Sequence, residues 1–256
     1  MDIAITREIP RSLERCELTH LAREPIDLPR AVAQHDAYCA ALVRLGLTVI
    51  RLPADELHPD CCFVEDTAVV LDEVAVIASP GAASRRGELP PIVDALARYR
   101  KLVRIELPAT LEGGDVLRVG RKLLVGRSAR TNDAGIAALQ HAAAPWGYEV
   151  VPIAVQGCLH LKSAVTALDD RTLLVSPAWL PRAALAGFEI IEVAIEEPGA
   201  ANVLRVRDGI LAHPGFPRTL ERIAQAGYRV TPVDISEFLK AEAALTCKSL
   251  LFRAGA

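Results

Sequence analysis

Short runs of apolar residues, separated by tight polar turns, recur along this chain in a pattern typical of β-hairpins. Five segments carry the pattern, and they start at Asp66 (DTAVVLDEVAVIA), Gly114 (GDVLRVGRKLLVG), Leu161 (LKSAVTALDDRTLLV), Ala201 (ANVLRVRDGILAH) and Thr246 (TCKSLLF). The fifth has only one strand, and the N-terminal run DIAITR is a strand without a partner. We expect these two to pair, because pairing removes an exposed sheet edge.

Stretches with helical periodicity lie between the hairpins, and several are followed by Gly and a further strand. They cover residues 30–45, 89–100, 129–144, 177–187 and 217–227. The repeating unit is therefore ββαβ, with a period of about 45 residues, as in circular or stacked repeat folds. Five units closing on themselves predict a single α/β domain, residues 1–256, folded as a propeller-like ring. An open mixed sheet with βαβ crossovers is the alternative that periodicity leaves open.

Composition narrows the class of protein. The 256 residues are 51% hydrophobic and 24% charged, which indicates a globular core rather than disorder. The net charge of -3 implies no basic face that would bind phosphate backbones or anionic lipid, so we expect neither a nucleic-acid nor a membrane partner. The N-terminus lacks the pattern of a signal peptide, and no apolar run approaches the roughly 20 residues of a membrane span. We therefore expect a cytoplasmic protein in which most of the six cysteines, none in CxxC spacing, are free thiols.

One polar residue stands near the start of the first strand in each hairpin. These residues are Asp66, Asp115, His160, Asn202 and Cys247. In a closed ring the strand starts converge on one axis, so side chains far apart in the sequence would share one pocket.

Cys247 is expected to start a strand with its thiol facing this axis. A neighbouring cation, such as protonated His160 or a bound guanidinium, would lower the pKa of the thiol. Alone, Cys247 would be read as a buried core cysteine and His160, flanked by leucines, as a core histidine. Glu112 precedes two glycines that permit a sharp turn, so its carboxylate could orient the imidazole. Together the three residues predict a nucleophile, a proton shuttle and an orienting carboxylate.

The run PDCCFVEDTAVV gathers Asp60, Glu65 and Asp66 at the mouth of an apolar strand. Buried carboxylates need a cation, and a planar guanidinium matches a carboxylate pair. A solvated acidic turn is the other interpretation. Four arginines are candidates for binding a carboxylate: Arg85, Arg86, Arg127 and Arg130. Acids and arginines together suit a zwitterionic amino acid. Motifs for NAD, ATP and structural zinc are missing, so we expect no cofactor.

Seven blocks resemble, in order and spacing, the motifs of dimethylarginine dimethylaminohydrolases, and the resemblance extends from Asp2 to Phe252. They are CFVEDTAVV, PGAASRRGE, LEGGDVL, ARTN, LHLKSAV, ANVLRV and LTCKSLLF. The resemblance implies the pentein fold, a five-fold pseudosymmetric α/β-propeller. It also implies that Cys247 is the nucleophile, His160 the general acid and base, and Glu112 the residue that orients His160.

The same resemblance implies the reaction and the substrate contacts. Cys247 would attack the guanidinium carbon of a methylated arginine, dimethylamine would leave, and water would release citrulline from a covalent thiouronium. The implied substrate-binding residues are the side chains of Asp60, Glu65, Asp66, Arg85 and Arg130 and the backbone of Leu18 and Ala241. Lys248 departs from the mammalian-like pattern, which has a second cysteine there. Some relatives bind inhibitory zinc through the cysteine and histidine, but two ligands are too few for a stable site, so we expect no metal.

Other members of the same fold leave alternatives open. Arginine deiminases and amidinotransferases share the cysteine and histidine, and a ribosome anti-association factor uses the scaffold only for binding. Cys247, His160 and Glu112 together argue against a non-enzyme. We expect a small-molecule substrate and a monomer or homodimer.

Overall fold

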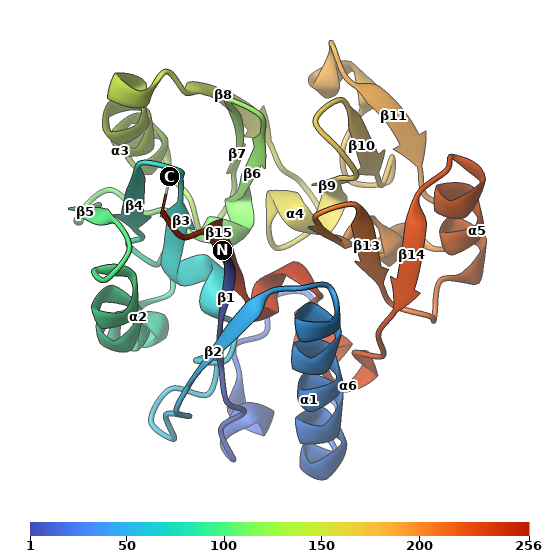
Figure 1. Ribbon diagram of the computed structural model, residues 1–256, viewed down its shortest axis with the longest axis horizontal. Helices are drawn as coiled ribbons and strands as arrows, with labels where there is room; N and C mark the ends of the chain where they lie inside the picture. The colour runs from blue at the N-terminus through green and yellow to red at the C-terminus, as the bar shows by residue number, and fades with distance from the viewer. Residues whose placement is uncertain (256) are drawn as a thin grey trace.

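Five small sheets surround one axis in the computed structural model, which describes residues 1–255 (Figure 1). Each sheet has three strands. Four of the sheets are each built from three consecutive strands. The first contains β3 (Ala68–Val70), β4 (Val74–Ile77) and β5 (Lys101–Arg104), and the second β6 (Val116–Val119), β7 (Lys122–Arg127) and β8 (Glu149–Ala154). The third contains β9 (Val165–Ala167), β10 (Thr172–Val175) and β11 (Glu189–Glu192), and the fourth β12 (Leu204–Val206), β13 (Gly209–Ala212) and β14 (Arg229–Pro232). In each, the first two strands are antiparallel and the third runs parallel to the second. This is the predicted ββαβ unit.

The fifth sheet closes the ring, as predicted. It contains β15 (Leu250–Arg253), β1 (Asp2–Arg7) and β2 (Thr48–Leu52). β1 pairs antiparallel with β15, from Asp2 opposite Arg253 to Ile5 opposite Leu250. The strands at the two ends of the chain thus pair with each other, without a connecting turn. Each covers a sheet edge that the other would expose alone.

Four of the five predicted helices are present: α1 (Leu28–Arg44), α2 (Leu89–Leu96), α3 (Asp133–Ala143) and α5 (Pro217–Gln225). α3 begins later than predicted because the side chain of Asn132 caps it, accepting from the backbone N–H of Gly135 at 2.8 Å. The prediction for residues 177–187 is wrong. That stretch has only a 3-10 turn, Arg182–Leu185, because Pro181 stays extended before it and Gly187 takes a left-handed φ of 92° after it. Two further short helices are α4 (Leu161–Ala164) and α6 (Ser236–Leu239).

Three of the residues predicted to start strands, Asp66, Asp115 and Cys247, lie instead in tight turns just before them. Asp66 is in a 3-10 turn, Val64–Thr67, that precedes β3, and Asp115 is in the turn Gly113–Asp115 that precedes β6. The prediction that Cys247 starts a strand is wrong in the same way, since it lies in the turn Thr246–Lys248 and β15 begins at Leu250. Consecutive residues of a 3-10 turn point about 120° apart. Neighbours in such a turn can therefore face different cavities.

No helix in the part of the chain that the structure describes is both long and apolar enough to cross a bilayer.

Candidate active site

The turns that precede the first strands meet at one end of the ring axis and surround a small cavity, which we name the cysteine cavity. It is lined by Glu17, Asp60, Phe63, Asp66, Arg85, Arg130, Leu159, His160, Ala241, Glu242, Ala243 and Cys247. The predicted convergence on one axis is thus correct for Asp66, His160 and Cys247. Asp115 and Asn202 do not line the cavity. The carboxylate of Asp115 instead accepts from the backbone N–H of Leu161 at 2.9 Å, which anchors the start of α4 next to His160.

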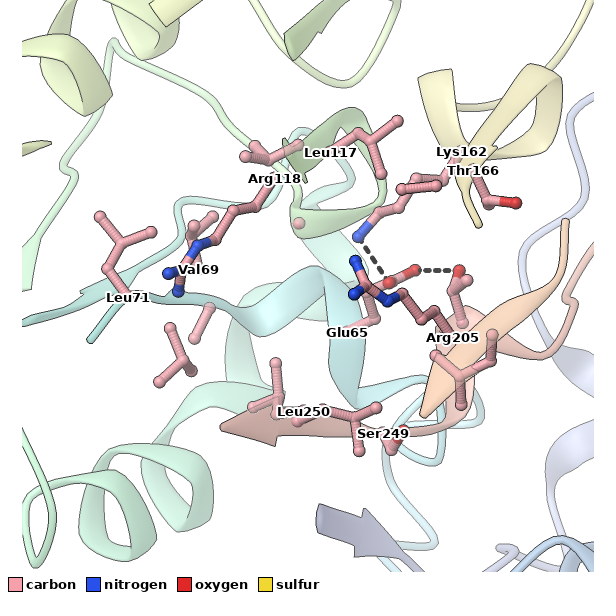
Figure 2. Close-up of a pocket in the computed structure, with 18 of the residues that line it drawn as sticks. Glu65, Val69, Leu71, Leu117, Arg118, Lys162, Thr166, Arg205, Ser249 and Leu250 are labelled. Atoms are coloured by element: carbon pink, nitrogen blue, oxygen red, sulfur yellow. Dashed lines mark hydrogen bonds and ion pairs between the residues drawn. The ribbon is translucent and has the colours of Figure 1, made fainter. Parts of the chain in front are cut away.

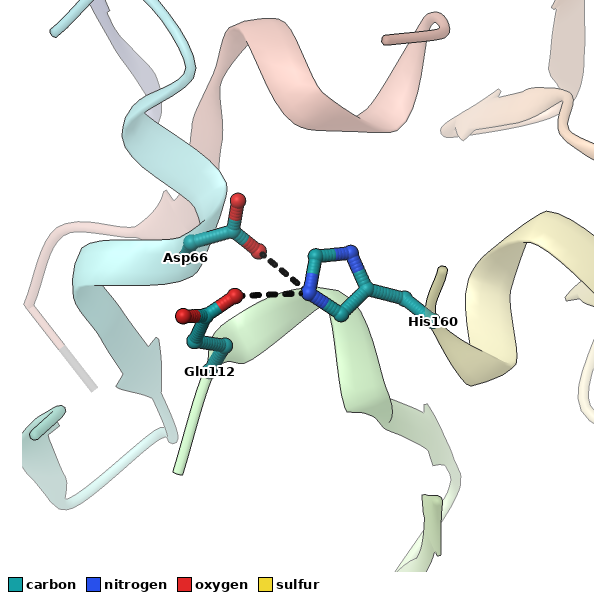
Figure 3. A group of neighbouring side chains, drawn as sticks. All are labelled: Asp66, Glu112 and His160. Carbon is teal, nitrogen blue, oxygen red and sulfur yellow. Dashed lines mark hydrogen bonds and ion pairs between the residues drawn. The ribbon is translucent and has the colours of Figure 1, made fainter. Parts of the chain in front are cut away.

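Two carboxylates, those of Asp66 and Glu112, face the same ring nitrogen of His160 (Figure 3). Its Nε2 lies 2.7 Å from Glu112 Oε2 and 3.9 Å from Asp66 Oδ1. Burial alone would lower the pKa of His160, but the charge of Asp66 and the hydrogen bond to Glu112 outweigh burial and raise it to about 9. The ring is therefore an imidazolium at neutral pH. This geometry agrees with the predicted pairing of Glu112 with His160.

The glycine after Gly113 is required by this packing. A Cβ on Gly114 would lie 2.6 Å from His160 Nδ1 and 2.7 Å from Asp66 Oδ1. The backbone N–H of Gly114 also donates to Asp66 Oδ1 at 2.9 Å. The EGGD sequence thus lets the backbone approach the two side chains closely, as its glycines predict.

Cys247 is partly exposed to the cavity, and its Sγ accepts from the backbone N–H of Ala244 at 3.4 Å. Burial raises the pKa of its thiol to about 12, and the negative charges of Glu65 and Asp66 add to the rise. Lys162 lowers the pKa by less. Without a bound cation the thiol is therefore protonated, so the expectation that protonated His160 alone would activate it is not met. The expectation that a bound guanidinium activates the thiol remains.

Arg85 helps to keep the carboxyl group of Asp66 ionised. Its Nη1 donates to Asp66 Oδ2 at 2.6 Å, and its Nε and Nη2 donate to Glu88 at 3.1 and 2.9 Å. Burial would raise the pKa of Asp66, but the charges of His160 and Arg85 reverse this and lower it to about 2. Asp66 is thus an anion facing the cavity. Arg85 lines the cavity with most of its N–H groups already bound.

Arg130 and Asp60 also line the cysteine cavity. Arg130 Nη1 is 3.4 Å from Glu112 Oε1, and its Nη2 donates to Thr19 Oγ1 at 3.2 Å. The Asp60 carboxylate accepts from the backbone N–H of Glu17 at 3.1 Å, and burial raises its pKa. An anionic and a cationic group therefore flank the space near Cys247, which suits the two ends of a zwitterion.

Glu65 faces away from the cysteine cavity. Its carboxylate accepts from Lys162 Nζ at 2.5 Å and from Thr246 Oγ1 at 2.6 Å. It lines a second pocket on the axis, together with Arg118 and Arg205 (Figure 2). We name this the axial pocket. Glu65 is separated from Asp66 because neighbours in a 3-10 turn diverge, so the sequence could not tell which of the two enters which cavity.

Three more predicted residues lie outside the cavity lining. Leu18 is half-buried next to Glu17. Arg86 donates to the carbonyl of Pro80, and Arg127 is paired at the surface with Asp133. Ala241, in contrast, lines the cavity.

Two functional residues were missed from the sequence. Lys162, two residues after His160, neutralises Glu65 beneath Cys247. Glu242 follows Ala241 with a left-handed φ of 52°, and its carboxylate accepts backbone N–H groups of Thr19, His20 and Leu21 at 2.5–3.0 Å. Neither the salt bridge nor the backbone angle has a local signal in the sequence.

Asp66, Glu112 and His160 each offer an atom that could bind a metal, and these atoms lie within 4.8 Å of one another. Their oxygens already accept from Arg85, Gly114 and the imidazolium, and a cation would be repelled by His160. A metal ion here would therefore have to displace bonds that these atoms already make.

A ring of five ββαβ units with a thiol, an imidazolium and carboxylates at one end of its axis defines a pentein-type cysteine enzyme. Residues 20–203 match the family model described as N,N dimethylarginine dimethylhydrolase, eukaryotic. This chain is 37% identical over 251 residues to N(G),N(G)-dimethylarginine dimethylaminohydrolase of Pseudomonas aeruginosa, covering 97% of this chain and 98% of the relative. It is 41% identical over 257 residues to the Streptomyces coelicolor enzyme of the same name, covering 97% and 96%.

Among solved structures, a cysteine-to-serine mutant of the Pseudomonas aeruginosa enzyme complexed with citrulline superimposes with a TM-score of 0.94 at 36% identity, and 98% of each chain is covered. The chain belongs to the dimethylarginine dimethylaminohydrolase family. Its pentein fold, predicted from the motifs, is confirmed by this match.

Proposed function

We propose that this protein hydrolyses Nω,Nω-dimethyl-L-arginine and Nω-monomethyl-L-arginine to L-citrulline and dimethylamine or methylamine. The names of the relatives and the citrulline bound to the related structure support this activity. The observation that carries the proposal is the position of Cys247 in one cavity with anionic Asp66 and the His160 imidazolium.

We infer that the substrate activates the nucleophile. A guanidinium beside Asp66 would bring a positive charge to Cys247, and an opposite charge within about 4–6 Å lowers the pKa of a thiol. The thiol proton would leave to solvent, and the thiolate would attack the guanidinium carbon. The thiol is then charged only when substrate is present, which protects it in the free enzyme.

His160 would act in both halves of the reaction. As the imidazolium it would give its proton to departing dimethylamine, leaving a thiouronium on Cys247 and a neutral ring. The neutral ring would then take a proton from the attacking water, and collapse of the adduct would release citrulline and the thiolate. Glu112, at 2.7 Å from Nε2, stabilises the charged ring at the start and end of the cycle.

We propose that the other ends of the substrate bind Asp60, at the α-amino group, and Arg130, at the α-carboxylate. Asp60 is a buried carboxylate and Arg130 is a cation at the same cavity. Backbone of Leu18 and Ala241 and the side chain of Arg85 complete the proposed contacts. Glu65 would not contact the guanidinium. It would act indirectly, through its bonds to Thr246 and Lys162.

Separate incubation of the purified protein with dimethylarginine, monomethylarginine and arginine tests the activity. We expect citrulline and dimethylamine from the first, and none from Cys247→Ser, which should fold normally. Ammonia and citrulline from arginine alone would identify a deiminase. No citrulline from any of the three would refute an enzyme of this type.

We also propose that the enzyme acts in the cytoplasm as a monomer or homodimer. All six cysteines are free thiols in the structure, which suits a reducing compartment. Fractionation of source cells and light scattering of the purified protein test the two statements.

A further inference from the structure

The end of the ring opposite the cysteine cavity carries a cationic groove. The turns that line the cysteine cavity precede the first strands, whereas this groove is lined by the hairpin tips that follow them and by the end of β15. Seven cationic and three acidic side chains line it, in a chain whose net charge is -3. We name it the arginine groove; its lining includes Arg100, Lys101, Arg118, Arg121, Arg207 and Trp146.

Two of its cations form no ion pair with a carboxylate in the part of the chain that the structure describes. Arg100 is 8% exposed and donates only to backbone carbonyls, those of Leu71, Tyr99 and Arg253. Lys101 is exposed, and no carboxylate in the described chain pairs with it. A partly desolvated guanidinium without an acid attracts anions more strongly than a solvated one.

Two of the other cations, Arg121 and Arg207, pair with acids at the surface. Arg121 pairs with Glu73 at 2.7 Å and Arg207 with Asp2 at 2.8 Å, with both arginine side chains about half exposed. Surface ion pairs of this kind contribute about 0–1 kcal/mol. A ligand with several negative charges can therefore take these guanidiniums from their present partners, and Arg recognises phosphate oxygens in pairs.

We propose that the arginine groove binds a small molecule carrying a triphosphate chain. The groove has a volume of about 920 Å³, too large to be filled by a single phosphate, and seven cationic side chains line it. Trp146 is 41% exposed at its edge, with Arg121 Nη1 donating to its carbonyl at 3.2 Å. An exposed indole there offers a surface on which a nucleotide base can stack.

The axial pocket connects the arginine groove with the end of the molecule that holds the cysteine cavity. Arg118 and Arg205 line both the groove and the axial pocket, whose other end holds Glu65, Lys162 and Thr246 (Figure 2). Lys162 and Thr246 lie two and one residues from His160 and Cys247. The proposal nevertheless concerns binding, which is measurable whether or not the protein hydrolyses methylarginine.

Isothermal titration of the full-length protein with inorganic tripolyphosphate and with ATP, at low and at raised salt, tests the site. We expect saturable one-to-one binding that weakens as salt rises. The double variant Lys101→Ala/Arg121→Ala should weaken binding about tenfold or more. Arg182→Ala removes an equally exposed arginine outside the groove and should leave the affinity unchanged.

Comparing the affinities of tripolyphosphate and ATP shows whether the phosphate chain alone or also the nucleoside contributes to binding. Equal affinity for both would assign the site to the triphosphate chain alone. Tighter binding of ATP that Trp146→Leu abolishes would assign it to a nucleotide. No saturable heat up to about 1 mM ligand at low salt, or an equal loss of affinity in Arg182→Ala, would overturn the proposal.

Discussion

Replacing Lys248 with methionine should stabilise this protein. Lys248 follows the proposed nucleophile but points into the core, where it is 1% exposed and its Nζ has no hydrogen-bond partner. The Nζ lies 3.0 Å from the centre of the Phe238 ring and 5.5 Å from that of Tyr38. A buried ammonium without an anion is among the most costly groups that a core can hold.

The size of the effect follows from the pKa. Burial lowers the pKa of Lys248 from 10.5 to about 7. At 1.36 kcal/mol for each pKa unit, this difference costs the folded state about 4–5 kcal/mol near neutral pH. The ring of Phe238 offsets about 2 kcal/mol of the cost by a cation–π contact. Methionine fills nearly the same volume without a charge, so we expect a net gain of about 2 kcal/mol in the free energy of unfolding.

The pH dependence distinguishes this cause from better packing. Because the folded pKa lies below the unfolded one, the unfolded chain binds the extra proton, and the cost is greatest below about pH 7 and disappears as pH rises toward 10.5. Urea unfolding of the wild type and Lys248→Met across this range should show the gap closing with pH. Lys101→Met, at an exposed lysine, is the control and should show no gap. A gap that is absent, reversed or independent of pH would refute the buried-ammonium argument.

Four further predictions concern the site. Arg130→Lys should raise KM about tenfold and change kcat little, because a remote carboxylate is bound equally before and at the transition state; a fall in kcat alone would contradict the assignment. Gly114→Ala should remove activity and cost about 1–3 kcal/mol of stability, since its Cβ would lie 2.6 Å from His160; wild-type rates would disprove the close packing. The kcat should fall as pH rises through about 9, where the imidazolium of His160, whose pKa is raised by Asp66 and Glu112, loses its proton; a flat alkaline limb would exclude it as the acid. Lys162→Met should destabilise the fold by about 3–5 kcal/mol by leaving Glu65 unpaired, and adding Glu65→Gln should restore most of this; no recovery would place the role of Lys162 elsewhere.

The ring itself could be predicted because its central strands are buried on both faces and read as unbroken apolar runs. Strands β4, β10 and β13 are completely buried, and their sequences VAVI, TLLV and GILA have no alternation. The helix prediction for residues 177–187 failed because hydrophobic periodicity takes no account of the two prolines there, Pro177 and Pro181, which interrupt backbone hydrogen bonding. The pattern of apolar residues thus determines the sheets more securely than the connections between them.

The convergence of Asp66, His160 and Cys247 on one cavity could be predicted from the sequence, but the directions of neighbouring side chains could not. Glu65 and Asp66 are neighbours in one acidic run, and from the sequence both suit a guanidinium. The 3-10 turn sends Asp66 to the cysteine cavity and Glu65 to Lys162 on the axial side. Thr246 and Cys247 divide in the same way, so that Thr246 donates to Glu65 while Cys247 faces the cysteine cavity. The two turns therefore build two layers: one that faces the cysteine cavity, and one in which Glu65 binds Lys162 and Thr246 on the axial side.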